Sequence, residues 1–141
     1  MFRKIISVAA APVLTARIIT GFIFLSEGMQ KFLYPETLGV GRFLKIGFSH
    51  PLFWAGFTGY TEIICAVLLL AGFLTRLAVI PLIIVMITAF ISTKIPILTD
   101  KGFWAFAHEY RTDFALTLLL FFLMYFGSGR YSTDNLLYGK K

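Results

Sequence analysis

The chain has little charge and only one cysteine. Of its 141 residues, 14% are charged and 58% are hydrophobic, and the mean hydropathy is +0.83. This composition is too apolar for an ordinary soluble domain and favours a protein embedded in a lipid bilayer. A lone Cys65 excludes an intrachain disulfide, a dithiol redox pair and a cysteine-based zinc site. We expect Cys65 to be a small core residue of an apolar helix.

The basic residues are scattered along the chain instead of forming one patch. The net charge is +6, but the 13 Lys and Arg residues concentrate mainly near the ends of apolar runs. This distribution is typical of membrane anchoring, so we expect no nucleic-acid partner. His50 and His108 show no ligand spacing with Cys65 or with each other, and we therefore expect no haem and no metal.

Four apolar runs are long enough to cross a bilayer. About 20 helical residues span the hydrocarbon layer, and the runs lack the alternation of a β-barrel strand. We therefore predict an all-α integral membrane protein, a four-helix transmembrane bundle that forms a single domain over residues 1–141. The predicted spans are residues 12–33, 52–73, 75–93 and 110–126.

The orientation follows from the Lys and Arg residues outside these spans. Cytoplasmic segments of membrane proteins are enriched in Lys and Arg. The richer side contains both termini and the turn after Gly72, so both termini are predicted to be cytoplasmic. Within this turn, Thr75 is a plausible N-cap of the next helix. The two groups are Arg3, Lys4, Arg76, Arg130, Lys140 and Lys141 on this side, and Arg42, Lys45, Lys94 and Lys101 on the other.

Charged residues inside the first two spans need partners. Glu27 and Lys31 are four residues apart in the first span, in the order that favours an ion pair. Glu62 lies near the middle of the second span, where an unpaired carboxylate is costly. Lys31 and Arg17, which share one stripe of the first helix, are its candidate cations.

The polar residues are predicted to converge on the outer half of the bundle. One interpretation is a buried ion-pair network that fixes helix register; the other is a pocket for a quinone headgroup, with Glu62 and Glu27 accepting protons. Aromatic walls are expected from Phe22, Phe24, Phe57 and Phe114, and the Gly-rich segment 35–51 lies over this side as a lid or a partner-binding surface. The candidate ligand-binding residues are Lys31, Arg17, Gln30, Thr58, Arg111 and Asp113, with Thr88, Ser92 and Lys94 added by the third span.

Three stretches resemble the DoxX family of small four-helix bacterial membrane proteins. They are "FIFLSEGMQKFLYPETLGVGRF", "GYTEIICAVLLLAGFLTR" and "GSGRYSTDNLL", and the resemblance extends from about Arg17 to Asp134. Many members carry His where this chain has Glu27. The matching positions are Arg17, Gly28, Lys31, Glu62, Gly72, Thr75, Arg76, Gly127, Gly129, Ser132 and Asp134.

The resemblance implies a place in the bacterial cytoplasmic membrane and a link to redox complexes. The family is named after a membrane subunit of a thiosulfate:quinone oxidoreductase, and related membrane proteins look like chaperones or cargo receptors. Two hypotheses follow: a quinone-binding subunit that receives electrons from a soluble or membrane redox partner, and a non-enzymatic scaffold whose buried charges are structural. Transport of a small solute is weaker, because four helices hardly form a pathway without a homo-oligomer.

Overall fold

Helices make up all the regular structure of the part of the chain that the computed structural model describes, residues 2–129 and 132–138. The basic residues Arg130, Lys140 and Lys141, which were used to predict the orientation, lie outside these ranges. The long helices are α1 (Phe2–Leu33), α3 (Pro51–Ala71), α4 (Thr75–Ala89) and α6 (Phe103–Phe126). The short elements are α2 (Val40–Ile46), the π-helix η1 (Phe90–Lys94), α5 (Ile95–Lys101) and α7 (Thr133–Tyr138).

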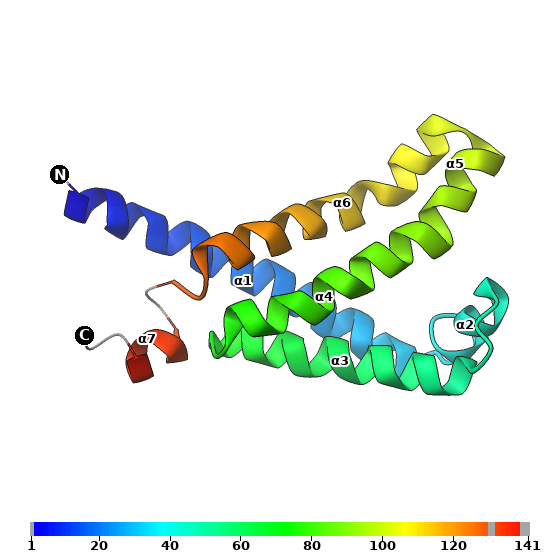
Figure 1. Ribbon diagram of the computed structural model, residues 1–141, viewed down its shortest axis with the longest axis horizontal. Helices are drawn as coiled ribbons and strands as arrows, with labels where there is room; N and C mark the ends of the chain where they lie inside the picture. The colour runs from blue at the N-terminus through cyan, green and yellow to red at the C-terminus, as the bar shows by residue number, and fades with distance from the viewer. Residues whose placement is uncertain (1, 130–131, 139–141) are drawn as a thin grey trace.

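The long helices pack as two pairs (Figure 1). Helix α1 lies along α3, and α4 lies along α6; we call these the α1–α3 arm and the α4–α6 arm. The arms meet at the joined end, where the turn 72–74 connects α3 to α4 and where α7 lies. Toward the opposite, diverging end the arms separate, and α2 lies at the tip of one arm while α5 lies at the tip of the other.

Three helical segments are long and apolar enough to cross a membrane. They are residues Pro12–Leu33, Pro51–Ala71 and Thr75–Lys101. Helix α6 is of similar length but carries Glu109, Arg111 and Asp113 in its first half. The prediction of an all-α membrane bundle is confirmed.

The third segment is interrupted by a wide turn just before Pro96. Because Pro96 has no N–H, it cannot donate to the carbonyl of Ser92, and a regular helix would be strained there. The chain forms the π-helix η1 instead, in which the Ile95 N–H donates to the Phe90 carbonyl five residues earlier. Helix therefore continues beyond the predicted end at residue 93, and Lys94, which was counted outside the spans for the orientation, is only 8% exposed.

The apolar core contains residues from all four long helices. Phe24, Leu69, Leu82 and Leu120 are each at most 1% exposed. Three of the four aromatic residues predicted to line a pocket lie instead on the protein surface, where in a bilayer they would face lipid. The exposed fractions are 59% for Phe22, 56% for Phe57 and 53% for Phe114.

Glycines allow α1 and α3 to approach closely. A Cβ atom added to Gly28 would lie 2.8 Å from Cγ1 of Ile63 and 2.9 Å from the Gly59 carbonyl oxygen. A backbone oxygen cannot move away without shifting its helix, so the separation of the two helices depends on the missing side chain.

We predict that Gly28→Ala destabilises the bundle by about 1–3 kcal/mol, the usual cost of overpacking a close contact. Gly56→Ala is the control, because a Cβ added there meets nothing within 4 Å. Alanine is favoured over glycine by about 0.5–1 kcal/mol within a helix, so Gly56→Ala should be neutral or stabilising. The free energy of unfolding in mixed micelles tests this, and equal effects of both substitutions would contradict the proposed close contact.

Candidate functional site

The charged residues of the membrane-spanning segments gather in three separate places. One lies in the α1–α3 arm, one lies in the α4–α6 arm, and the third lies at the joined end. The single outer pocket expected from the sequence is therefore replaced by separate groups on different helix pairs.

The first group is centred on an ion pair between α1 and α3. Nζ of Lys31 lies 2.8 Å from Oε2 of Glu62. Glu62 is only 3% exposed. Lys31, and not Arg17, is therefore the cation that compensates the Glu62 carboxylate.

The neighbours of this pair differ from the predicted arrangement. Glu27 is exposed and does not form the predicted ion pair with Lys31. Its negative charge repels that of Glu62. The Gln30 side-chain amide donates to Oγ of Ser26 at 2.8 Å. Thr58 is half-buried one turn before Glu62 on α3.

Arg42 belongs to the same group, and sequence reasoning did not single it out. It lies on α2, which packs against α3, and its charge interacts with that of Glu62. Arg42 is exposed, so it lies at the outer edge of the group. Helix α2 thus adds a second cation to the surroundings of Glu62.

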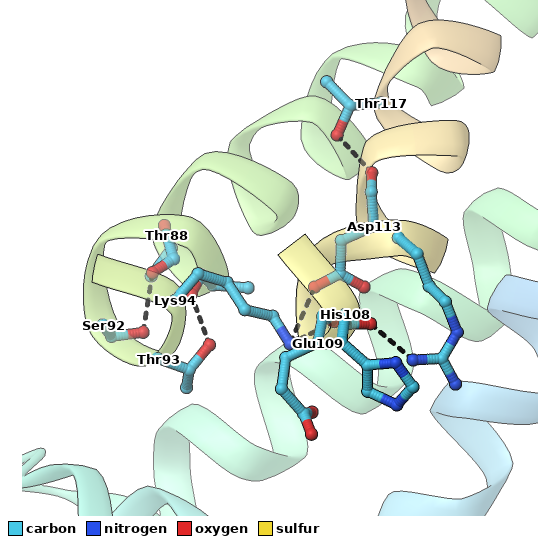
Figure 2. Close-up of polar contacts among 10 residues, drawn as sticks. Thr88, Ser92, Thr93, Lys94, His108, Glu109, Asp113 and Thr117 are labelled. Atoms are coloured by element: carbon cyan, nitrogen blue, oxygen red, sulfur yellow. Dashed lines mark hydrogen bonds and ion pairs between the residues drawn. The ribbon is translucent and has the colours of Figure 1, made fainter. Parts of the chain in front are cut away.

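The second group joins η1 to α6 (Figure 2). Nζ of Lys94 lies 3.3 Å from Oδ2 of Asp113 and donates to the Glu109 carbonyl oxygen at 3.2 Å. The Thr117 hydroxyl donates to the Asp113 carbonyl oxygen at 2.7 Å. The exposed Arg111 donates to the carbonyl oxygen of His108. Asp113 is thus paired within the α4–α6 arm, and neither Asp113 nor Arg111 joins Glu62.

Hydroxyl groups on α4 and η1 are satisfied locally near Lys94. Thr88 donates to the Ile84 carbonyl oxygen, Ser92 to that of Thr88, and Thr93 to that of Ala89. All three bonds reach back four residues along the helix. These hydroxyls therefore have partners within their own helix and are not held ready for a ligand.

The third group surrounds Arg17, at the joined end. Arg17 is 2% exposed. Its Nε donates to the Leu69 carbonyl oxygen at 2.9 Å, its Nη2 to that of Leu70 at 3.1 Å, and its Nη1 to that of Ser128 at 3.0 Å. A guanidinium is well suited to this role, because its planar fork of donors can reach several carbonyls of a helix C-terminus at once.

Asp134 completes this group from the C-terminal segment. Its carboxylate accepts from the backbone N–H groups of Leu74, at 3.0 Å, and Thr75, at 3.4 Å. The Asp134 N–H in turn donates to the Gly72 carbonyl oxygen at 3.0 Å. The N-cap of α4 is Leu74, with a positive φ of 49°, and not Thr75 as predicted. Asp134 thus provides the capping carboxylate from a position 60 residues away.

Gly72 leaves the space that this group requires. Its φ is 71°, and an added Cβ would lie 2.5 Å from Nη2 of Arg17 and 2.6 Å from Cβ of Ser132. Only glycine tolerates both this backbone conformation and this contact. The turn after α3 is therefore shaped around the buried guanidinium.

Two open clefts of the described residues lie away from Glu62. One, of about 570 Å³, is at the joined end and is lined by residues 74–77, 126–129 and Asp134. The other, of about 530 Å³, is lined by residues 49–53. Within residues 2–129 and 132–138, no three His, Cys, Asp or Glu side chains come together to hold a metal ion. Neither cleft is lined by a member of the Lys31–Glu62 pair or of the Lys94–Asp113 pair.

We predict that Arg17→Lys lowers the free energy of unfolding by more than about 2 kcal/mol, because an ammonium cannot reach all three carbonyl groups. Arg42→Lys is the control, since Arg42 is exposed and should change stability by less than about 0.5 kcal/mol. Unfolding of both variants in the same micelles provides the measurement. Equal stability of the two variants would show that the fork of donors is unimportant.

Comparison with known proteins agrees with this membrane architecture. The family model described as DoxX matches residues 13–95. The chain is also 45% identical over 131 residues to the "Uncharacterized membrane protein Rv3486" of Mycobacterium tuberculosis (strain ATCC 25618 / H37Rv), a match that covers 89% of this chain and 80% of the relative. No solved structure matches the chain. The chain thus belongs to the DoxX family of membrane proteins.

Proposed function

We propose that this protein is a non-enzymatic membrane scaffold whose buried charges hold its helices in register. The observation behind the proposal is that the buried cations have internal partners. Lys31 is paired with Glu62, Lys94 with Asp113, and Arg17 with three backbone carbonyls. A substrate-binding group would instead be expected to face an open cavity.

The energetics of buried ion pairs agree with this role. Removing two charges from water costs about as much as their attraction returns, so such a pair adds little stability compared with apolar packing. Breaking one pair, however, leaves a charge in an apolar environment, which is strongly unfavourable. A pair between two helices therefore penalises every register except the one that brings its members together.

A scaffold needs a surface for its partners, and the segment 35–51 is the strongest candidate. Helix α2 carries the exposed residues Arg42, Leu44 and Lys45, and Leu44 is 65% exposed. A basic surface with an apolar centre suits an acidic partner protein or another copy of the chain. In this proposal the protein lies in the bacterial cytoplasmic membrane with both termini in the cytoplasm, and α2 faces the outer side.

A quinone-binding subunit is the second candidate. It is supported by the electrostatic interaction of Glu27 and Arg42 with Glu62, which gives this group two carboxylates and two cations. Glu62 and Glu27 would accept protons, while Lys31 and Arg42 would hold a headgroup oxygen. The headgroup would have to replace the 2.8 Å contact between Lys31 and Glu62. Electrons would come from a partner subunit, because Cys65 is the only cysteine of the chain and cannot form a dithiol redox pair by itself.

The double variant Lys31→Met/Glu62→Gln tests the scaffold proposal. Each single substitution should destabilise the protein by about 3–5 kcal/mol, because it leaves a buried group without its partner. The double variant should cost clearly less than the sum of the two single variants. Glu27→Gln, at an exposed neighbouring position, is the control and should leave stability unchanged. Additive losses would contradict the structural role of the pair.

The same variants distinguish the two candidate functions. Native mass spectra of the protein, gently extracted from its membranes, would reveal bound isoprenoid quinone and co-purifying subunits. The scaffold proposal predicts co-purifying protein partners. It also predicts that substitution of Glu27 or Glu62 does not change the amount of bound quinone. Quinone that is bound to the wild type and lost from the folded Glu27→Gln variant would favour the redox subunit.

A further inference from the structure

The cleft of about 570 Å³ at the joined end has no role in either proposed function. It lies between the start of α4 and the loop that follows α6. The predicted span of α3 ends at Ala71 and that of α4 begins at Thr75, so the cleft lies where the helices leave the apolar layer. Its lining residues are Leu74, Thr75, Arg76, Leu77, Phe126, Gly127, Ser128, Gly129 and Asp134.

Backbone donors of the first turn of α4 lie in this cleft. The first hydrogen bond within α4 is donated by the Ala78 N–H to the Leu74 carbonyl oxygen. The four preceding N–H groups have no acceptor within the helix. Asp134 accepts from two of them, those of Leu74 and Thr75. The N–H groups of Arg76 and Leu77 remain, at the end of the helix where its dipole favours an anion.

A buried hydroxyl in the cleft lining lacks a partner. Thr75 is 1% exposed, and its Oγ1 has no hydrogen-bond partner among the described residues. Polar atoms this deeply buried are nearly always hydrogen-bonded in folded proteins, because an unpaired one is costly. The hydroxyl is therefore a second, independent sign that a polar group is missing from this site.

The side chain of Arg76 adds positive charge to the same place. Its Nη2 donates to the Tyr125 carbonyl oxygen at 2.9 Å, which uses one of the five guanidinium donors. A Cβ added to Gly127 would lie 3.3 Å from Nε of Arg76, so the guanidinium lies close to the loop backbone. Asp134 also lines the cleft, but its negative charge faces two N–H groups and interacts with Arg17. Among the lining residues, Arg76 and Asp134 carry one charge each, and the Asp134 charge is already engaged by these partners.

We propose that this cleft binds a phosphate group, held by the Arg76 guanidinium, the N–H groups of Arg76 and Leu77, and the Thr75 hydroxyl. Phosphate oxygens accept several hydrogen bonds at once, and arginine with a helix N-terminus is a common combination for binding them. At this depth the group can belong to a lipid headgroup or to a free phosphate compound. Both sources present the same oxygen acceptors to the site.

Native mass spectrometry of the full chain with phosphatidylglycerol tests the proposal. Arg76→Gln should weaken retention of this lipid about tenfold, and Thr75→Val, which removes only the hydroxyl, should weaken it about threefold. Lys101→Gln is the control, because it removes one exposed positive charge at the diverging end, and it should retain the lipid like the wild type. Thermal unfolding confirms that each variant is folded, and Thr75→Val remains informative if Arg76→Gln does not fold.

Adding inorganic phosphate distinguishes the two sources. Displacement of phosphatidylglycerol by phosphate, dependent on Arg76, would support a site open to free phosphate compounds. Retention of the lipid in excess phosphate, also dependent on Arg76, would support a lipid headgroup site. The proposal is overturned if Arg76→Gln and Thr75→Val retain the lipid as the wild type does, or if Lys101→Gln weakens it as much as Arg76→Gln.

Discussion

The structure depends on the three hydrogen bonds that the buried Arg17 donates at the joined end. One guanidinium on α1 reaches the last carbonyls of α3 and the carbonyl of Ser128 beyond α6. Asp134 then joins the C-terminal segment to the start of α4. All four long helices therefore meet around two side chains of opposite charge. A buried arginine is stable there because the carbonyls at a helix C-terminus carry partial negative charge and lack partners within the helix.

Away from this end, each arm is held by its own ion pair. Lys31–Glu62 ties α1 to α3, and Lys94–Asp113 ties η1 to α6. Neither pair reaches the other arm, so the polar residues do not form one continuous network. This separation explains how a small membrane protein can contain charges in both arms, because Lys31 is compensated by Glu62 and Lys94 by Asp113 on a neighbouring helix.

The fold was predictable from the sequence to a large extent. The apolar runs predicted membrane helices, and the cost of an unpaired Glu62 predicted a cation from the first helix, which is Lys31. The helical wheel could not exclude Arg17, because it shows the face of a helix and not the depth. The two residues share a stripe but are 14 positions apart, which is about 21 Å along the axis.

Other features depended on tertiary contacts that one sequence does not reveal. The capping of α4 by Asp134 joins residues 60 positions apart, and no local pattern predicts it. The pairing of Asp113 with Lys94 depended on helix continuing past residue 93. Pro96 was a signal for the irregular turn, since apolar residues continue on both sides of it. The resemblance to the DoxX family included Arg17, Gly72 and Asp134, and the structure brings these residues together at the joined end.

Hydrogen exchange of the Lys94→Met variant tests most directly whether the polar groups are separate. The backbone amides of the intact protein and of the variant would be compared in the same micelles by mass spectrometry. Our account predicts faster exchange in η1, α5 and the first half of α6, and unchanged exchange around Lys31 and Glu62. Faster exchange in both arms together would contradict it and would favour a single coupled network across the diverging end.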